Sequence, residues 1–312
     1  MQLKARMELI SGLLSSDRPV TSSELLCLSG LGREELKFFE LKWAEVSPAR
    51  KCEIISHLVH LSETDFGLDF TAVFVCCLND ADEVVRLRAI QGLEGEDNYL
   101  LIAPLVRCLK QDSSVRVREA AATALGSFAM LAERGKMSPH YTDMVYEALL
   151  DVLNDEQEPV QVRRRALEAI SPFSQPRVKE LIERAYREGG AEFKLSAIYA
   201  MGRNCDLVWL DYLLDELESD DAAVRYEAAN ACAELGAEEA VPQLLRLVED
   251  TDTQVQEAAI RALGEIGGGD AKRALTRLLR SHEPRIRQAA EAALEELRLN
   301  EEPLSQSLDD LD

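Results

Sequence analysis

Hydrophobic and polar positions recur along this chain with a fixed period. In each copy a branched or aromatic residue and a basic residue precede two alanine-like positions and a leucine-like position. The last five of seven copies follow one another at one constant spacing, and the copies start at Val85, Val117, Val162, Phe193, Val224, Val255 and Ile286. This spacing of roughly 31 residues is typical of a solenoid, in which each repeat packs only on its neighbours.

Each period predicts two antiparallel helices. In one unit, residues 240–248 carry apolar side chains at helical spacing, and residues 249–252 form a polar turn with helix-capping residues. Residues 255–266 carry a second apolar stripe, and the glycines at 267–269 end that helix. The predicted fold is an all-α, right-handed superhelical solenoid of about seven helical hairpins, each of roughly 31 residues.

The period is broken once and decays at both ends. Between Val117 and Val162 an insertion predicts a longer helix pair near residues 113–154, whose first helix runs from Pro139 to Asn154. Residues 1–63 are predicted to form a helical N-terminal cap with a degenerate repeat, and residues 64–298 the solenoid. Residues 299–312 are acidic and are predicted to be a disordered tail.

Charge and cysteine content restrict the function. The formal net charge of −22 argues against binding to nucleic acid, because phosphate neutralisation needs clustered Lys and Arg. The seven cysteines are an odd count without a Cys-x-x-Cys pair, which favours a reducing compartment. No apolar run is long enough to span a membrane, and Glu8 interrupts the N-terminal apolar stretch. We expect a cytoplasmic monomer with no nucleic-acid or membrane partner.

The second helices carry a family resemblance. Residues 221–229 and 252–264 share the pattern Asp-x-x-Val-x-x-x-Ala, with Arg after the first of the two valines, and each contains an Ala-Ala pair. This pattern, over about residues 64–298, is similar to the HEAT-like repeats of the phycobilisome-lyase type. The resemblance implies a helical-repeat fold. Repeats of this type serve as scaffolds, as lyases that hold a tetrapyrrole, and in a few enzymes.

One enzyme with repeats of this type requires a residue pattern that can be checked in this sequence. Deoxyhypusine hydroxylase places His-Glu pairs after the Val-Arg dipeptide of several repeats, and these pairs hold two irons. The corresponding dipeptides here are Leu87-Arg88, Glu119-Ala120, Arg164-Arg165, Leu195-Ser196, Tyr226-Glu227, Glu257-Ala258 and Gln288-Ala289. The single His-Glu pair, His282-Glu283, falls in the turn before the last helix. The sequence therefore predicts no enzymatic activity, no catalytic residue and no cofactor.

A basic residue recurs directly after the first residue of the copies. It is predicted to form a structural ladder with carboxylates or carbonyls of the turns, and a phosphate-binding row is the alternative. Pairs with an acidic residue six positions earlier are suggested at Asp80/Arg86, Asp112/Arg118 and Glu188/Lys194. The predicted ladder comprises Arg86, Arg118, Arg163, Lys194, Arg225 and Arg287, with Gln256 as the exception.

Histidines offer one candidate metal site. Glu53, His57 and His60 lie at helical spacing on one predicted helix, where three ligands could share a face. His57 occupies a position that other repeats fill with a core leucine. We therefore predict a structural histidine and no metal.

The candidate binding site lies on the second helices. Positions two, six and ten after the first residue are expected to point away from the core and to line the concave face. In the middle repeats these positions hold Arg164, Tyr199, Arg203, Tyr226 and Asn230. Arginine and tyrosine are enriched at binding hot spots. An ordinary solvated face with internal ion pairs is the alternative to a binding groove.

Two functions follow from this site. The leading hypothesis is a non-enzymatic scaffold that binds an unidentified protein partner along the concave face. The alternative is a bilin-lyase-like chaperone or enzyme that binds a tetrapyrrole or another anionic ligand. The acidic tail raises the further hypothesis that it docks back on the Arg/Tyr cluster.

Overall fold

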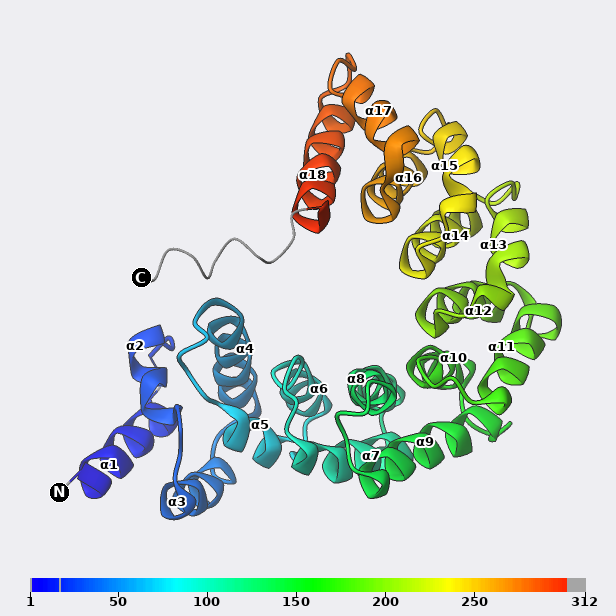
Figure 1. Ribbon diagram of the computed structural model, residues 1–312. Helices are drawn as coiled ribbons and strands as arrows, with labels where there is room; N and C mark the ends of the chain where they lie inside the picture. The colour runs from blue at the N-terminus through cyan, green and yellow to red at the C-terminus, as the bar shows by residue number, and fades with distance from the viewer. Residues whose placement is uncertain (1, 17, 302–312) are drawn as a thin grey trace, which may run out of the picture. The chain divides into compact units, whose positions relative to one another are not determined.

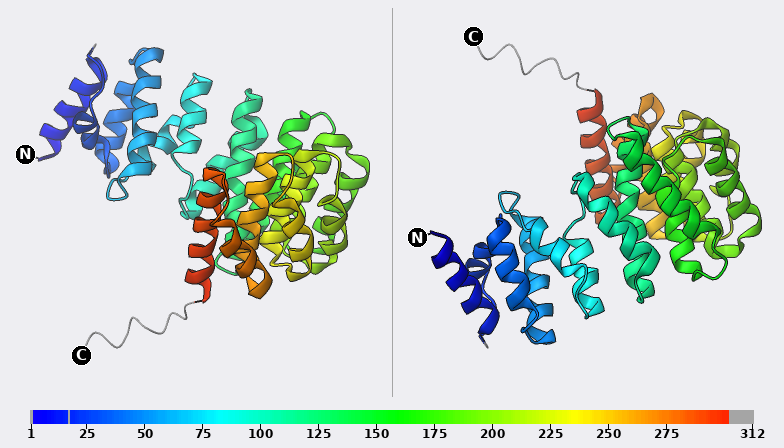
Figure 2. Two further views of the ribbon diagram at one scale, coloured as in Figure 1. Left: turned by 90° about the horizontal axis from the view of Figure 1, so that it is seen from above. Right: turned by 90° about the horizontal axis from the view of Figure 1, so that it is seen from below.

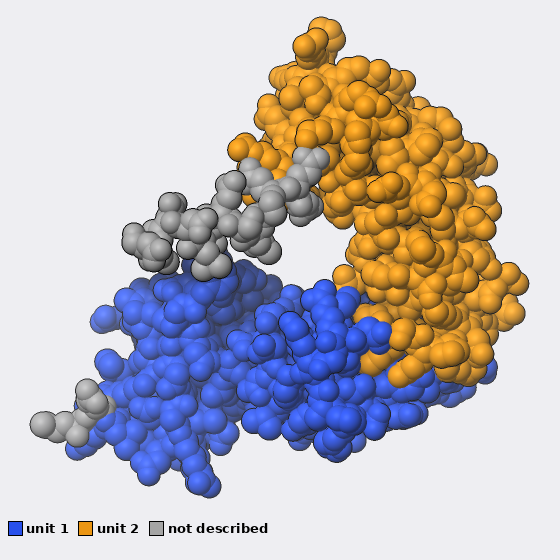
Figure 3. Space-filling model, viewed as in Figure 1, with its two compact units in different colours: residues 1–170 blue, residues 171–312 orange. Residues whose placement is uncertain are grey.

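The computed structural model describes residues 2–16 and 18–301, which form helices joined by short turns, with no strand in this part of the chain (Figure 1). The chain divides into two compact units, residues 1–170 and 171–312 (Figure 3). The structure is therefore all-α and consists of stacked helical hairpins, as the period predicts.

Unit 1 begins with an N-terminal group of helices, up to α3, and continues with helices that pack in pairs. Its elements are α1 (Gln2–Ser15), α2 (Ser22–Leu25), η1 (Leu26–Leu28), α3 (Arg33–Trp43), α4 (Pro48–Thr64), α5 (Thr71–Cys77), α6 (Glu83–Gln91), η2 (Tyr99–Leu101), α7 (Ile102–Gln111), α8 (Val115–Glu133), α9 (Pro139–Asn154) and α10 (Val160–Ile170). Helix α9 has the bounds that the insertion predicts. The Thr21 amide donates to the Glu24 carboxylate at the start of α2, which is one half of a capping box.

Unit 2 stacks four hairpins. Its elements are α11 (Pro176–Glu188), α12 (Gly190–Asn204), η3 (Leu207–Trp209), α13 (Leu210–Glu216), α14 (Ala222–Leu235), η4 (Glu238–Ala240), α15 (Val241–Leu247), α16 (Thr253–Ile266), α17 (Gly268–Leu278) and α18 (Pro284–Glu301). The second helices α12, α14, α16 and α18 form one layer and α11, α13, α15 and α17 the other (Figure 1). Figure 2 shows this stacking from two further directions.

The boundaries of the structure differ in part from the predicted ones. Helix α18 extends to Glu301, so residues 299–301, predicted as the start of a tail, are helical. Residues 302–312 lie outside the described residues. The boundaries at residues 63 and 298 stay predictions, because the division at residue 170 reflects compactness and not the repeat pattern.

The repeat positions form the core. The first residue of each copy is buried, and both alanine-like positions are buried in the copies from Val162 onward, for example Val255, Ala259 and Ala262. His57 is exposed, and the neighbouring Leu58 occupies the core instead, which corrects the predicted position of this histidine. None of the helices within the described part of the chain is long and apolar enough to cross a membrane. The cytoplasmic location stays a prediction.

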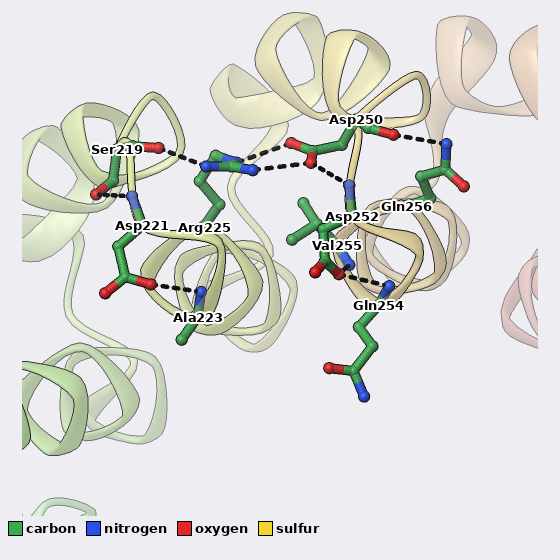
Figure 4. A network of polar contacts seen from close by, with 9 residues as sticks. All are labelled: Ser219, Asp221, Ala223, Arg225, Asp250, Asp252, Gln254, Val255 and Gln256. Atoms are coloured by element: carbon green, nitrogen blue, oxygen red, sulfur yellow. Dashed lines mark hydrogen bonds and ion pairs between the residues drawn. The ribbon is translucent and has the colours of Figure 1, made fainter.

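Basic side chains join each turn to the next repeat. The Arg225 Nη1 donates to the Ser219 carbonyl at 2.7 Å, while its Nε and Nη2 donate to the two carboxylate oxygens of Asp250 at 2.7 and 2.8 Å (Figure 4). Arg86 makes the same contacts with the Asp80 carbonyl and the Asp112 carboxylate. We call this set of links the arginine ladder. It is bidentate and charge-assisted, which makes such bonds strong and directional.

The partners in the arginine ladder differ from those suggested by the sequence. At Arg86, Arg118 and Arg225 the residue six positions earlier contributes its carbonyl oxygen, whereas the carboxylate comes from the following repeat. Arg118 reaches across the insertion to Glu158 at 2.7 Å. Lys194 pairs with Glu216 at 2.7 Å, and not with Glu188. The remaining predicted members make carbonyl bonds, Arg163 to Leu153 and Arg287 to Ser281 and His282.

Candidate functional site

Twelve side chains of unit 2 form a regular surface on its second helices. They occupy positions two, six and ten after the first residue of each copy, and none of them is buried. In Figure 1 these helices lie on the inner side of the curve of unit 2. We call this surface the inner face, and it comprises Leu195, Tyr199, Arg203, Tyr226, Asn230, Glu234, Glu257, Arg261, Glu265, Gln288, Ala292 and Glu296.

Four of the five predicted site residues belong to the inner face. Tyr199 on α12 is 38% exposed, and Tyr226 and Asn230 on α14 are half-buried. The fifth, Arg164, is a half-buried residue of α10 in unit 1. The predicted cluster is therefore divided between the two units, and its larger part lies on α12 and α14.

Ion pairs neutralise the two arginines of the inner face, one between neighbouring helices and one within α16. Arg203 lies 3.6 Å from the Glu234 carboxylate on the next second helix. Arg261 donates to the Asn230 side chain and lies 3.7 Å from the Glu265 carboxylate. Arg203 of the predicted cluster thus has an anionic partner on the same surface, as the alternative of a face with internal ion pairs expects, and the binding role of the cluster stays a prediction. The attraction expected for an acidic ligand or an acidic tail is reduced accordingly.

The inner face holds four glutamates against two arginines, so negative charge remains in excess after the ion pairs are counted. Three of these glutamates form a line. Glu234, Glu265 and Glu296 are each one repeat period apart and lie on successive helices α14, α16 and α18. We call these three residues the glutamate column. Partial burial between the helices raises the pKa of Glu234. Partial burial and then the negative charge of Glu296 raise the pKa of Glu265. Three carboxylates in a row make this part of the surface attractive to cations.

A groove lies beside the glutamate column, between α16 and α18. Its volume is about 480 Å³. Alanines from α18 lie in the middle of its lining, and charged groups of both helices surround them. The lining residues are Glu257, Arg261, Arg285, Gln288, Ala289, Ala292, Ala293 and Glu296. Small residues leave room for a long side chain, and two of the surrounding groups are carboxylates.

The glutamate column can be predicted from the repeat period, although the predicted site does not include it. Each of its members stands at position ten of its copy, so the repeat period alone aligns them. The site predicted from the sequence rests on arginine and tyrosine side chains, and these do not mark position ten of the last three copies. The signal that reveals the column is a comparison of one position through all copies.

The predicted histidine set does not form a metal site. His57 and His60 are exposed on α4. The Glu53 carboxylate accepts the Val20 amide at 2.8 Å and pairs with Arg50 at 2.9 Å, and the bond from Val20 lowers its pKa. The Glu53 carboxylate therefore holds the N-terminal segment against α4, and its oxygens are engaged by Val20 and Arg50.

A family model for HEAT repeats matches residues 71–134 and 210–295 of the chain. The matched segments coincide with α5–α8 in unit 1 and α13–α18 in unit 2. Over these two segments, which together make up just under half of the chain, the sequence is similar to HEAT repeats. These repeats confirm the predicted fold class and the predicted HEAT-like character of the second helices. They account for the arginine ladder and the buried alanines as parts of the fold.

Curated relatives match 100 residues of this chain. A deoxyhypusine hydroxylase of Candida albicans is 29% identical over 100 residues, covering 31% of this chain and 31% of the relative. That of Drosophila melanogaster is 31% identical over 100 residues, covering 31% of this chain and 33% of the relative. The matched segment thus spans about a third of the relatives' length. These names contradict the prediction of a non-enzymatic chain, because both relatives are enzymes.

Solved structures with a similar chain path include an engineered protein and human deoxyhypusine hydroxylase in complex with glycerol. The engineered protein is 21% identical, with a TM-score of 0.40 and coverage of 95% of this chain and 90% of its own. The human enzyme is 20% identical, with a TM-score of 0.32 and coverage of 95% and 97%.

The side chains of this chain do not fit the two irons that the resemblance to deoxyhypusine hydroxylase implies. The corresponding positions on α12 and α14 hold Leu195-Ser196 and Tyr226-Glu227, and His282-Glu283 lies in the exposed turn before α18. Residues 2–16 and 18–301 contain no group of three or more His, Cys, Asp or Glu placed to hold a metal ion. An iron centre needs several converging imidazole and carboxylate ligands.

Proposed function

We propose that the inner face of unit 2 binds a segment of a protein partner that carries basic side chains. The observation that carries this proposal is the glutamate column. Its three carboxylates are spaced along one surface, and partial burial raises the pKa of Glu234 and Glu265. A lysine or arginine of a partner relieves the repulsion within the column, and opposite charges on the two proteins accelerate their encounter.

The remaining parts of the inner face supply shape and apolar contact. Tyr199 and Tyr226 present an aromatic ring and a hydroxyl group at the α12–α14 end, and such side chains are frequent binding hot spots. At the other end, Ala289 and Ala292 line the groove and leave space for the aliphatic stem of a basic residue. Binding of this kind agrees with the scaffold hypothesis and is equally compatible with recognition of a protein substrate by an enzyme.

Charge reversal in the column tests the proposal. The double variant Glu265→Lys/Glu296→Lys is compared with Glu238→Lys/Glu239→Lys, which changes the net charge equally at exposed positions of η4. A fluorescently labelled lysine-rich peptide is titrated in an anisotropy assay. We expect the first variant to bind it about tenfold more weakly, at roughly 1.4 kcal/mol, and the second to be nearly unchanged. Equal losses in both variants would show that only net charge matters.

Capture from a native lysate then connects the peptide to a partner. The wild-type chain and both variants are immobilised, and the retained proteins are identified by mass spectrometry. A partner retained by the wild type and by the η4 variant, but lost from the column variant, agrees with the proposal. A Tyr199→Ala/Tyr226→Ala variant that retains every partner contradicts the role of the aromatic end.

A second candidate is the reaction named for the curated relatives, hydroxylation of deoxyhypusine. The identity of 29–31% over 100 residues favours it. The test incubates the purified chain with a deoxyhypusine-containing substrate and detects the hydroxylated product by mass spectrometry. Product formation would establish the activity and would require a metal centre other than the His-Glu pairs. No product under conditions that support the relatives' reaction would leave partner binding as the function.

A further inference from the structure

The last HEAT repeat leaves one link of the arginine ladder open. The Arg287 Nη1 donates to the carbonyls of Ser281 at 2.8 Å and His282 at 3.2 Å. Arg225 makes the equivalent carbonyl bond and adds two bonds to the Asp250 carboxylate. No described residue offers a carboxylate to Arg287, because no further repeat follows α18 in the described part of the chain. The Nε and Nη2 donors of Arg287 are therefore available for an acidic group.

Apolar residues at the same end of unit 2 lack the cover that their counterparts have. Val248 is 8% and Leu263 is 0% exposed, since the following repeat packs on them. Leu279 and Leu294 stand one period further along, in the same positions of the last repeat, and are only half-buried. The end of the stack thus combines partly uncovered leucines with an arginine that has two N–H donors available for an anionic partner. This combination fits a segment that is both acidic and apolar.

We propose that residues 302–312 of this same chain cover the open end of unit 2. This segment contains four acidic residues and no basic one. Its leucines Leu304, Leu308 and Leu311 are spaced four and three residues apart, as they are in an apolar stripe. The leucines cover Leu279 and Leu294, and a carboxylate of the Asp309–Asp312 stretch bonds Arg287. The segment takes the place that a further repeat would occupy.

The length of the segment permits this docking. From Glu301 back to Arg287 the helix α18 spans about 21 Å at 1.5 Å per residue. Eleven residues follow Glu301, and extended they reach about 36 Å. The segment can therefore turn back after α18 and reach the first turn of that helix. A second copy of this chain, stacked end to end, is the competing occupant.

Hydrogen exchange in full-length variants tests the proposal. Asp309→Asn/Asp310→Asn/Asp312→Asn removes the carboxylates, and Arg287→Gln removes their partner while keeping the carbonyl bond that Gln256 makes at its own position. We expect each change to raise the exchange rate of amides 278–290 severalfold, and the combined variant to add little. Additive effects, or unchanged protection in the aspartate variant, would overturn the proposal.

Two further variants separate the occupants. Leu308→Ser/Leu311→Ser should weaken protection at residues 278–290 as much as loss of the carboxylates does. The control Glu238→Gln/Glu239→Gln/Glu249→Gln removes three charges from exposed positions of the same unit and should leave protection unchanged. Light scattering completes the set. A wild-type dimer whose protection at residues 278–290 fades on dilution would assign this surface to a second copy and overturn docking of the chain's own segment.

Discussion

At the scale of single residues, a paired change explains the break in the arginine ladder. Gln256 stands one repeat period after Arg225, and Ser281 stands one period after Asp250. Gln256 keeps the carbonyl bond, at 2.7 Å to Asp250, but its Oε1 is buried without a partner among the described residues. Ser281 keeps the turn by accepting the Glu283 amide at 3.2 Å. Losing the cation and the anion together leaves no buried charge unpaired.

This pairing predicts the cost of single and double changes elsewhere in the ladder. Arg225 and Asp250 are 13% and 7% exposed, so Arg225→Gln leaves a nearly buried carboxylate without its cation. We expect a loss of about 3 kcal/mol in the free energy of unfolding. Adding Asp250→Ser, which copies the natural Gln256/Ser281 combination, should recover more than half of it. Urea unfolding of the four proteins of this cycle measures both values. If the double variant is as unstable as the sum of the single ones, the pair is not the unit of stabilisation.

At the scale of helices, glycine sets how closely neighbouring second helices pack. A Cβ built on Gly202 of α12 would lie 2.7 Å from the Ala231 Cα of α14. A Cβ on Gly264 of α16 would likewise lie 2.9 Å from the Ala293 Cα of α18. Two helices can approach this closely only where one of them has no side chain. The glycines therefore fix the spacing of the second helices, and with it the spacing of the inner face.

Replacing glycine by alanine should change the free energy of unfolding in opposite directions at Gly202 and at Gly12. Gly202→Ala forces α12 and α14 apart, and we expect a loss of about 1–3 kcal/mol in the free energy of unfolding. Gly12 lies within α1 with no atom within 4 Å of an added Cβ. Gly12→Ala should therefore gain about 0.5–1 kcal/mol from helix propensity. Thermal unfolding of both variants distinguishes packing from propensity, and stabilisation by both would contradict the close contact.

At the scale of the whole molecule, carboxylates act on stability in two opposite directions. In the ladder, the bonds from Arg225 lower the pKa of Asp250. Such a group stabilises the fold above the pKa of its unfolded form, and the stabilisation is lost as the pH falls through the lower, folded pKa. In the glutamate column, partial burial raises the pKa of Glu234 and Glu265. Their ionisation therefore costs stability as the pH rises above about 4.5.

Neutral substitutes in the column should thus stabilise the chain in a pH-dependent way. We expect Glu234→Gln/Glu265→Gln to raise the Tm at pH 7, with the difference shrinking as the pH falls toward about 4.5. Thermal unfolding between pH 4 and pH 8 measures this, with Glu239→Gln as an exposed control. A Tm difference that is constant with pH, or a lower Tm at pH 7, would contradict the raised pKa values.

The sequence predicted the helices well and their lateral partners poorly. Apolar positions repeat at a constant spacing, so helix pairs such as α15 and α16 follow from the period, and Pro139 marked the start of α9. The carboxylate that joins Arg118 lies 40 residues away, because an inserted segment intervenes. The Arg203–Glu234 contact joins two copies, and reading each copy alone gave a basic surface where the arginine in fact has an anionic partner on the next helix. Contacts between repeats depend on how the helices stack, which a period does not specify.

The arginine ladder has a consequence for how such a chain can grow or shrink. A complete repeat of the ladder carries a cation for its successor and an anion for its predecessor: in one repeat, Arg118 bonds Glu158 ahead of it and Asp112 bonds Arg86 behind it. Duplication of one whole repeat therefore creates a new ionic link of the same kind and breaks none. Point substitution of one partner has no such compensation. Duplication of a whole repeat is thus the change that this arrangement tolerates best. The link at Gln256 and Ser281 shows a second tolerated arrangement, in which both charged partners are absent together.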